Sequence, residues 1–477
     1  MSDTVTTPAT PRAPLLARVH RAVAARLTWE WPPVRTTLAV GVGTAISLAP
    51  GLLPRTAAAQ SLLTVLLVLL GLGVARLVRV AAVRVAAGDA YPSSARTRRL
   101  VCTATAAGVL GAAVYAGVWQ NTLRSAMGRA PAGPGYWASW LIGSILLSVV
   151  LALVAIGVGR ALRRIGWSRL LVMTVVAGLP LALFGMPAVV GWGDQAYAAA
   201  NAAVDPNLVQ PVTMTRSGST ESMVSWSSLG REGQRFVTAG PPGAVHVYVG
   251  LRSAPDLAAR ADLAVRELER AGGFDRSHLV VAVPTGSGWV DARALRGFGD
   301  RFGGDVAVVA LQYSYAPSWA TFVFGRHAAA ASAQALVAAV EQRLATMDRP
   351  PRLYLYGQSL GALGGSAVFA GAADQNHRVC SALWAGMPGG GSPAPGSRTV
   401  MLANSSDPVV HWSLDLLWRR PDLTAARRDA PTPPWLPVAS FVQTTADLLG
   451  ALGAPPGHGH RYDIDQGTAL PDCTPAR

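Results

Sequence analysis

The sequence has 477 residues, of which 51% are hydrophobic and only 14% charged, and its mean hydropathy is +0.31. This composition is too apolar for an ordinary soluble protein and indicates membrane-spanning segments. The net charge of +15 arises within the first 190 residues, which hold 18 Arg and three acidic residues, whereas residues 191–477 hold 23 basic and 23 acidic residues. Basic side chains that flank apolar segments indicate membrane topology, so we expect no nucleic-acid partner.

The N-terminal part of the chain divides into a polar tail and a series of apolar segments. Residues 1–35 are Arg-rich and lack the short apolar core and cleavage site of a signal peptide, so we expect a retained cytoplasmic tail. Residues 36–192 are expected to form a helical membrane domain of about five spans, each near the length that a bilayer requires. The predicted spans are residues 36–53, 58–80, 100–119, 137–159 and 170–191.

Arginine is distributed unevenly among the connections between these segments. The tail, the second connection and the fourth connection hold 15 Arg, whereas the first and third hold three: Arg55, Arg124 and Arg129. Because basic residues concentrate on the cytoplasmic side, this predicts a multi-pass protein of the cytoplasmic membrane with its N-terminus inside and its C-terminal half outside. The spans carry no central Asp, Glu or His, which favours an anchor in the lipid bilayer over a proton-coupled transporter.

The C-terminal half has the composition of a soluble domain. Residues 193–244 are rich in Ser, Gly and Pro and are expected to form a linker ahead of a further domain, residues 245–477. There, short apolar strands alternate with helices, which is typical of a mostly parallel, doubly wound α/β sheet. The expected strands are 245–250, 279–283, 306–311, 353–356, 381–384 and 399–403, and the expected helices are 256–271, 291–298, 327–347 and 360–370.

Three motifs follow strand ends in the order that a Ser, Asp and His triad requires. The motif GQSLG (357–361) predicts a tight turn that exposes Ser359 as a nucleophile. Asp407, in NSSDP (404–408), follows a later strand and would orient the base, although an Asp-Pro turn residue is the alternative. The loop GHGHRY (457–462) offers two bases, His458 and His460; we favour His460, but the sequence does not decide between them.

Two further loops are expected beside Ser359. An oxyanion hole needs backbone N–H donors, one of which would be Leu360. The loop PTGSGWVD (284–291) would supply another, or it is a plain turn; its candidate residues are Thr285, Gly286, Ser287 and Gly288. The loop QYSYAPSW (312–319) would line a substrate pocket or touch the membrane; its candidate residues are Gln312, Tyr313, Tyr315 and Trp319.

The few cysteines and the spacing of the histidines limit the remaining chemistry. Cys380 and Cys473 both lie in the half that is predicted to be outside, where disulfides persist, so they are a possible pair. Cys102 lies within a predicted span. No cluster of residues has the spacing of metal ligands, so we expect neither a metal nor another cofactor.

The motifs GQSLGA (357–362), PTGSGWVD, QYSYAPSW and GHGHRY together resemble the bacterial integral-membrane α/β-hydrolase family. In this family an N-terminal multi-span domain is joined to a C-terminal hydrolase domain. Residues 217–231, which contain SGS, VSW and LGR, also resemble the family's segment ahead of the sheet. The resemblance implies a serine-hydrolase fold over most of the chain, without defining a substrate.

Together these features predict a membrane-anchored serine hydrolase whose active site lies outside the cytoplasmic membrane. Its substrate would be an ester, such as a lipid or a cell-envelope acyl group, and the reaction would pass through an acyl-Ser359 intermediate. An acyltransferase to a lipid or glycan hydroxyl is an alternative, because the chemistry up to the acyl-enzyme is shared. A second alternative is a membrane scaffold or sensor that keeps the hydrolase fold without activity. The oligomeric state is not indicated.

Overall fold

The structure is a computed structural model that describes residues 31–86, 93–165, 186–203, 205–389, 391 and 393–473. The described residues fall into two units. The first unit comprises the residues up to Ala49, together with Ala58–Gly117 and Trp140–Leu147. The second comprises Pro50–Ala57, Val118–Ser139 and the residues from Ser148 onward. Two short connections between N-terminal helices therefore group with the C-terminal part of the chain.

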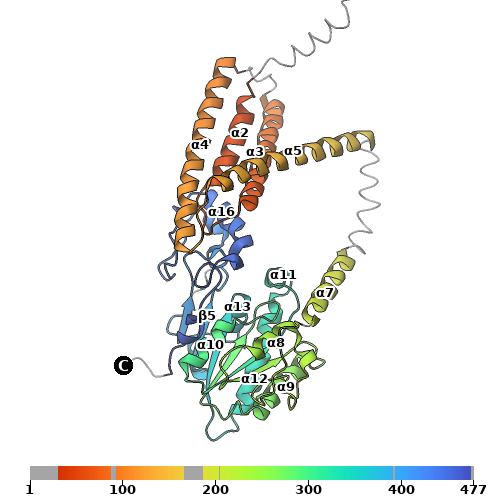
Figure 1. The fold of residues 1–477 in the computed structure, drawn as a ribbon, viewed down its shortest axis with the longest axis vertical. Coiled ribbons are helices and arrows are strands. Elements are labelled where there is room, and N and C mark those ends of the chain that lie inside the picture. The colour runs from red at the N-terminus through yellow and green to blue at the C-terminus, as the bar shows by residue number, and fades with distance from the viewer. Residues whose placement is uncertain are drawn as a thin grey trace, which may run out of the picture. The chain divides into compact units, whose positions relative to one another are not determined.

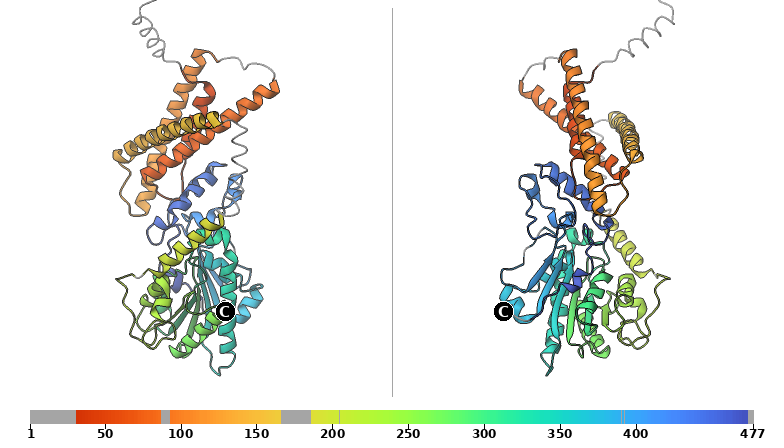
Figure 2. Two further views of the ribbon diagram at one scale, coloured as in Figure 1. Left: turned by 90° about the vertical axis from the view of Figure 1, so that its right-hand side faces the viewer. Right: turned by 60° about the vertical axis from the view of Figure 1, so that its left-hand side comes forward.

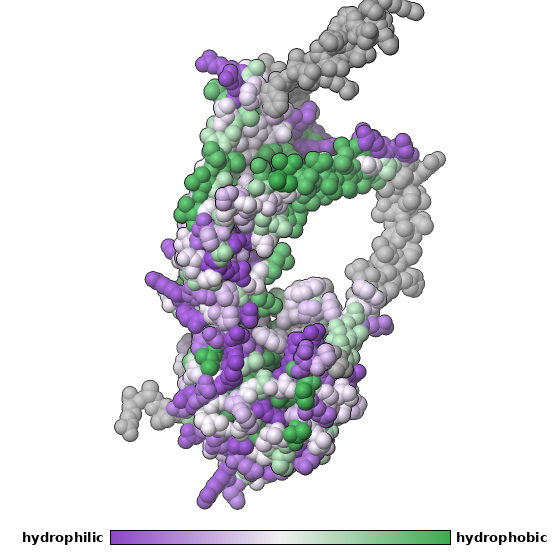
Figure 3. Space-filling view, in the orientation of Figure 1, coloured by the Kyte–Doolittle hydropathy of each residue, from purple (hydrophilic) through white to green (hydrophobic). Residues whose placement is uncertain are grey.

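Long apolar helices dominate the N-terminal region. They are α2 (Val34–Leu48), α3 (Ala57–Ala86), α4 (Ala95–Ala126) and α5 (Pro134–Ile165). By length and composition, three stretches of the described chain can cross a membrane: Ala57–Ala82, Ala95–Ala126 and Pro134–Arg164. They confirm the predicted helices at 58–80, 100–119 and 137–159. Figure 3 shows hydrophobic side chains gathered along α5, as expected of a surface that faces lipid.

The predicted number of five spans differs from what the described residues contain. The first expected span, 36–53, becomes a 15-residue helix that ends at Leu48. Ala49 is extended, with ψ of 152°, because a residue that precedes a proline disfavours the helical conformation. Residues 170–185 of the fifth expected span lie outside the described residues, and the chain after them forms α7 (Met186–Ala202). Three candidate spans are therefore found in the described chain.

Small residues allow the helices of the first unit to approach one another closely. A Cβ at Gly43 of α2 would lie 2.7 Å from the carbonyl oxygen of Leu67, and one at Gly71 of α3 would lie 2.9 Å from that of Ala39. The hydroxyl groups of Ser47 and Thr64 lie 2.9 Å apart between the same two helices. Close backbone approach and hydrogen bonds between helices are typical of packing within a membrane.

The second unit contains a six-stranded parallel sheet with the order β1-β3-β2-β4-β5-β6 (Figures 1 and 2). The strands are β1 (Val245–Val249), β2 (His278–Val283), β3 (Val306–Leu311), β4 (Arg352–Gln358), β5 (Ser381–Ala385) and β6 (Thr399–Leu402). The inner strands are short and almost wholly buried, as expected when helices cover both faces. This confirms the predicted doubly wound sheet.

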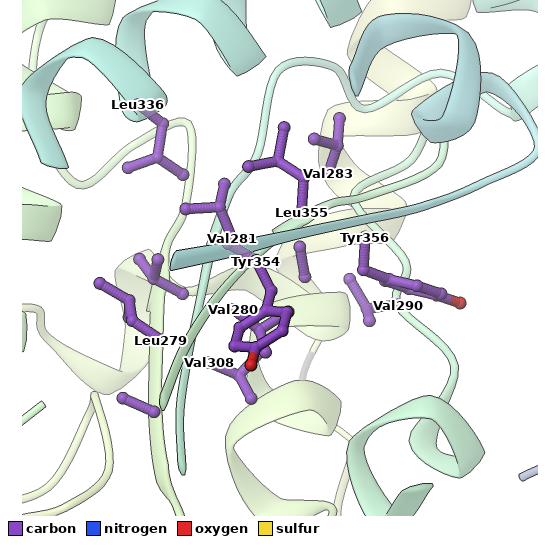
Figure 4. Packing of buried hydrophobic residues seen from close by; sticks show 14 of the residues in the cluster. Leu279, Val280, Val281, Val283, Val290, Val308, Leu336, Tyr354, Leu355 and Tyr356 are labelled. Carbon is purple, nitrogen blue, oxygen red and sulfur yellow. The ribbon is translucent and has the colours of Figure 1, made fainter. Parts of the chain in front are cut away.

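Helices pack on both faces of this sheet, and the side chains buried between helices and sheet form the core. Figure 4 shows Leu336 on the side of Val281 and Leu355, whereas Tyr354 and Tyr356 point to the opposite side. On that opposite side the ring of Tyr356 lies 5.2 Å from that of Phe298. The helices that contact the strands are α9 (Leu257–Arg270), α10 (Ala292–Arg301), α12 (Arg326–Leu344) and α13 (Leu360–Ser366), and the chain also forms α11 (Ser318–Phe324) and α14 (Ala372–Arg378).

Two regions without a clear periodic pattern also contain short helices. Ahead of the sheet, the expected linker 193–244 includes η2 (Trp226–Ser228) and α8 (Gly230–Thr238). Phe236 of α8 is buried, and its ring lies 5.4 Å from that of Tyr248 in β1, so this segment contributes to the core. After β6 the chain forms α15 (Pro408–His411), η3 (Leu414–Leu417), α16 (Ala439–Asp447), η4 (Leu448–Gly453) and α17 (Asp465–Thr468).

A disulfide joins Cys380, at the start of β5, to Cys473 near the end of the described chain, and their Cα atoms lie 4.7 Å apart. The hydroxyl of Ser381 donates a hydrogen bond to the carbonyl oxygen of Pro471 over 2.8 Å. The C-terminal segment is thereby fixed beside β5.

Candidate active site

The chain makes a strained turn between β4 and α13, and Ser359 occupies it. Ser359 has φ of 56° and ψ of −123°, a backbone conformation that is costly for a residue with a side chain. Its amide donates to the carbonyl oxygen of Ala385 over 2.8 Å, which ties the turn to the end of β5. A Cβ at Gly361 would lie 2.1 Å from the carbonyl oxygen of Val283, so only glycine fits there. These features have the geometry of a nucleophile elbow.

A buried carboxylate and an imidazole form a hydrogen-bonded pair. Asp407 caps α15 just past β6, and its Oδ1 accepts from the amide of Val409 over 2.8 Å. Its Oδ2 lies 2.8 Å from Nδ1 of His460 and accepts from the hydroxyl of Tyr462 over 2.7 Å. Because an ionised carboxylate only accepts hydrogen bonds, Nδ1 of His460 carries the proton. In the neutral ring the opposite nitrogen, Nε2, is then an acceptor.

Competing effects act on the pKa of Asp407. Complete burial would raise it, but His460, the Tyr462 hydroxyl and the Val409 amide together hold the pKa below its ordinary value. The carboxylate thus stays ionised where it contacts the imidazole.

The imidazole of His460 lies beside the segment that holds Ser359. A Cβ at Gly386 would lie 2.7 Å from Cε1 of His460, and Gly386 directly follows Ala385, which binds the amide of Ser359. Among the described residues, Nε2 of His460 has no hydrogen-bond partner, although it is buried. Gly386 also has φ of 61°, which favours glycine independently of the space available. The fold therefore places an unpartnered acceptor nitrogen next to the serine turn.

His458, the other expected base, has a different partner. Its Nδ1 lies 3.1 Å from Oδ2 of Asp429, and the side chain is 21% exposed. Asp429 also accepts from the amide and the hydroxyl of Ser406, and that hydroxyl accepts from the amide of Gly459 over 2.8 Å. His458 and Asp429 thus hold the loop that carries His460. No sequence signal indicated these contacts of Tyr462, although it lies within GHGHRY, or of Asp429, which lies in an irregular segment.

The expected oxyanion donors differ in whether their backbone amides already have a hydrogen-bond partner. The amide of Thr285 donates to the Trp289 carbonyl over 2.9 Å, and the amide of Gly288 donates to the Thr285 carbonyl over 2.8 Å. The amide of Gly286 donates to the Ser318 hydroxyl over 3.2 Å. Within the described chain, Ser287 alone among these four residues keeps an amide without a partner. The start of the loop approaches the serine turn, because a Cβ at Gly361 would lie 2.8 Å from the carbonyl oxygen of Pro284.

Two of the four expected pocket residues support this loop instead of lying open to a ligand. The Gln312 side chain is buried and donates to the carbonyl oxygen of Ser287 over 2.9 Å. The Tyr313 hydroxyl donates to the carbonyl oxygen of Pro284 over 3.0 Å, and burial raises the pKa of Tyr313. Tyr315 is half-buried, and Trp319 is 66% exposed. Only the second half of the 312–319 loop is therefore accessible to solvent.

The described residues contain no group of three or more His, Cys, Asp or Glu side chains placed to hold a metal ion. The titratable groups around Ser359 instead form the hydrogen-bonded pair of Asp407 and His460.

Replacing Tyr462 by phenylalanine tests the contribution of its hydroxyl. We expect Tyr462→Phe to lower the free energy of unfolding by about 1–3 kcal/mol, because a buried carboxylate loses a donor. A carboxyl group whose pKa is lowered on folding contributes stability above its unfolded value, 3.8, and this contribution is lost as the pH falls through the folded pKa. With a smaller shift, Tyr462→Phe should lose stability at a higher pH than the wild type.

Thermal unfolding followed from neutral pH down to about pH 3 measures this effect. The matched control is Tyr356→Phe, which removes an equally buried hydroxyl that donates to Gln466 Oε1 over 2.6 Å. The control should lower the melting temperature without shifting the acidic pH range over which the melting temperature falls. If Tyr462→Phe and the wild type lose stability over the same acidic pH range, the prediction is contradicted.

Comparison with known proteins agrees with this architecture. A parallel sheet with a strained serine turn after one strand defines the α/β-hydrolase class of fold. The model of the family described as "Alpha/beta-hydrolase family" matches residues 245–394 and 389–474, and the model described as "Alpha/beta-hydrolase family N-terminus" matches residues 48–241. The chain belongs to this α/β-hydrolase family and carries both its N-terminal and its hydrolase part.

Other comparisons add little. None of the curated proteins matches the chain. Among solved structures, Trichoderma reesei cutinase in complex with a C11Y4 phosphonate inhibitor is similar, with 14% sequence identity and a TM-score of 0.24. The likeness covers 40% of this chain and 87% of the cutinase chain. At that TM-score it supports no conclusion about this protein.

Proposed function

We propose that this protein is a membrane-anchored serine hydrolase that cleaves acyl esters through an acyl-Ser359 intermediate. The observation that carries the proposal is the His460 side chain. Its Nδ1 is bound to buried Asp407, and its Nε2 is buried and unpartnered beside the turn that presents Ser359. A buried acceptor without a donor is costly, and a serine hydroxyl or a substrate proton would satisfy it.

The reaction would use these groups in sequence. The Ser359 hydroxyl attacks the ester carbonyl carbon while Nε2 of His460 accepts the hydroxyl proton, and Asp407 stabilises the resulting imidazolium. The amides of Leu360 and Ser287 would donate to the oxygen that becomes negative. When the ester bond breaks, His460 returns the proton to the leaving alcohol. Water, activated by the same nitrogen, then attacks the acyl group and releases the acid together with free Ser359.

A fluorophosphonate probe tests the proposal directly, because it reacts with activated serines. We expect the full-length protein in detergent to be labelled once per chain, with the adduct on the peptide that contains Ser359. Incubation with an acyl ester should release one acid per ester when water is the acceptor. Release of alcohol with the acyl group found on an added lipid or glycan hydroxyl would identify an acyltransferase instead. A folded protein that never labels would point to the scaffold or sensor.

The second unit supports an extracytoplasmic active site. It includes Pro50–Ala57 and Val118–Ser139, the two connections that carry few arginines and are expected outside. Arg55, in the first of them, forms an ion pair with Asp447 of the hydrolase domain. A domain bonded to an outer connection must lie on the same side of the bilayer. The tail of the chain and the Arg-rich connections would then lie in the cytoplasm.

Cysteine accessibility checks this topology. In a Cys102→Ser background, we expect Ser227→Cys, an exposed position ahead of the sheet, to react with a membrane-impermeant maleimide in intact cells. Ser94→Cys, an exposed position in the Arg-rich second connection, is the matched control and should react only after the membrane is permeabilised. The reverse pattern would place the hydrolase domain in the cytoplasm.

A further inference from the structure

The connection Pro50–Ala57 is bonded to the segment that precedes the His460 loop. The amides of Leu52 and Leu53 donate to Oδ2 of Asp447 over 2.6 and 3.4 Å. The Arg55 guanidinium donates to Oδ1 of the same carboxylate from Nε over 2.9 Å and from Nη2 over 2.7 Å. Both side chains are almost fully buried, with exposures of 7% for Arg55 and 0% for Asp447. All of these residues belong to the second unit.

Arg55 also forms hydrogen bonds with Gln443, one turn earlier in α16, and with residues of the connection Val118–Ser139. Its guanidinium donates to the side chain of Gln443 and to the Gln443 carbonyl oxygen, the latter over 3.0 Å. Its own amide donates to Gln120 Oε1 over 3.1 Å, and its carbonyl oxygen accepts from Arg124 over 2.7 Å. Arg55 therefore fixes the C-terminal end of α16, where η4 begins.

From η4 the contacts pass directly to the loop that carries the imidazole. The carbonyl oxygen of Ala451 accepts from the amide of His460 over 3.2 Å. A Cβ at Gly459 would lie 2.8 Å from Cβ of Ala454 and 3.3 Å from Cδ2 of Leu53. The residue before His460 is thus enclosed by η4 on one side and by the connection itself on the other. Buried Leu52 and Leu53 pack with Ala454 in one apolar cluster.

We propose that Arg55 is a positioning residue for His460, and that the connection Pro50–Ala57 between the N-terminal helices is a structural part of the active site. This inference rests on the proposed function. Arg55 holds Asp447, Asp447 fixes the start of η4, and η4 together with Leu53 fixes the backbone on which His460 sits. The hydrolase domain would consequently have a misplaced base if it were separated from this connection.

The burial of the ion pair makes the arrangement sensitive to the loss of either partner. Burial raises the pKa of Asp447 above its ordinary value, although Arg55 and the amides of Leu52 and Leu53 oppose this. Without Arg55 an uncompensated carboxylate would remain inside the protein, and the surrounding segment would have to move to hydrate it. Because η4 directly follows Asp447 and its Ala451 carbonyl binds the amide of His460, such a displacement would pass to the His460 loop.

The test compares Arg55→Ala with Arg270→Ala in the full-length protein in lipid nanodiscs. Arg270 is a matched control, because it pairs with Glu267 at the same 2.7 Å distance, and Glu267 is also 0% exposed. Its helix, α9, packs on β1 and β3, at the sheet edge opposite β5 and β6. We expect Arg55→Ala to lower the rate of fluorophosphonate labelling by about 10²-fold, since a displacement of about 1 Å has that effect on catalysis. Arg270→Ala should label at close to the wild-type rate.

Hydrogen–deuterium exchange of residues 457–461 provides a readout that does not depend on activity. We expect faster exchange there in Arg55→Ala and unchanged exchange in Arg270→Ala. Arg55→Lys keeps the charge but loses the forked donors, so it should give intermediate labelling and exchange. If Arg55→Ala does not fold, Leu53→Ala removes the contact at Gly459 without leaving a buried charge, and it should show the same change at residues 457–461.

The possible results separate this inference from the proposed function. Unchanged exchange at residues 457–461 in Arg55→Ala, or an equal loss of labelling in Arg270→Ala, would overturn the positioning role. A wild-type protein that never labels would overturn the proposed hydrolase, while the exchange experiment would still decide whether Arg55 holds the loop.

Discussion

Ser359→Ala is expected to lower the rate of ester cleavage by about 10⁶-fold, because it removes the hydroxyl oxygen that would accept the acyl group. Fluorophosphonate labelling should disappear with it. The loss should not come from unfolding, since alanine fills less space than serine and the Ser359 amide still binds the Ala385 carbonyl. Initial rates on a chromogenic acyl ester, measured with equal amounts of folded protein, check this expectation.

The control for this variant is Ser366→Ala, on the same short helix. The Ser366 hydroxyl donates to the Leu363 carbonyl oxygen over 3.0 Å, so the substitution removes a serine hydroxyl from α13 without touching the turn. Its rate should remain near that of the wild type. Residual cleavage in Ser359→Ala at a rate comparable to Ser366→Ala would show that another group carries the acyl transfer.

His460→Ala and His458→Ala are expected to differ strongly in their effect on activity. Removing the imidazole that Asp407 holds should lower the cleavage rate by about 10⁶-fold, comparable to the loss of the serine, because the two act as one unit. Removing His458 breaks the contact with Asp429 and should cost about 1–3 kcal/mol of stability through the loop. Its activity, measured well below the melting temperature, should fall far less.

The comparison is informative because the two histidines are separated by one glycine and lie in the same loop. Rates and melting temperatures of both variants should be measured together. A large loss of activity in His458→Ala, with His460→Ala still active, would exchange the two roles and refute the assignment made from the Asp407 contact.

The serine turn was predictable because its determinants are local. Gly357 and Gly361 flank Ser359 at the positions where β4 approaches the start of α13 and where α13 approaches the end of β2, and the sequence shows that spacing directly. The parallel sheet was predictable for a related reason. Continuous apolar strands that alternate with helices leave few arrangements other than a sheet covered on both faces.

The sequence could not decide between His458 and His460 as the candidate base, because the choice depends on contacts far along the chain. Asp407 lies 53 residues before His460, and Asp429, which takes His458, lies in a segment without helical or strand periodicity. Within the 284–288 loop, the partner of the Gly286 amide is likewise set by a tertiary contact, the one with Ser318. By contrast, the early end of the first predicted span could have been predicted from Ala49-Pro50, because a residue before proline disfavours the helical conformation.

The disulfide between Cys380 and Cys473 has a consequence for covalent continuity. It closes a ring of chain that contains both Asp407 and His460, whereas Ser359 lies outside the ring. In the chain-entropy account, closing a loop between residues that are 93 positions apart stabilises the fold by about 4.6 kcal/mol. A proteolytic cut in the irregular stretch 419–437 would leave the fragment that contains Asp407 and the fragment that contains His460 joined by the disulfide. The chain could therefore be cut there without releasing either partner of the hydrogen-bonded pair.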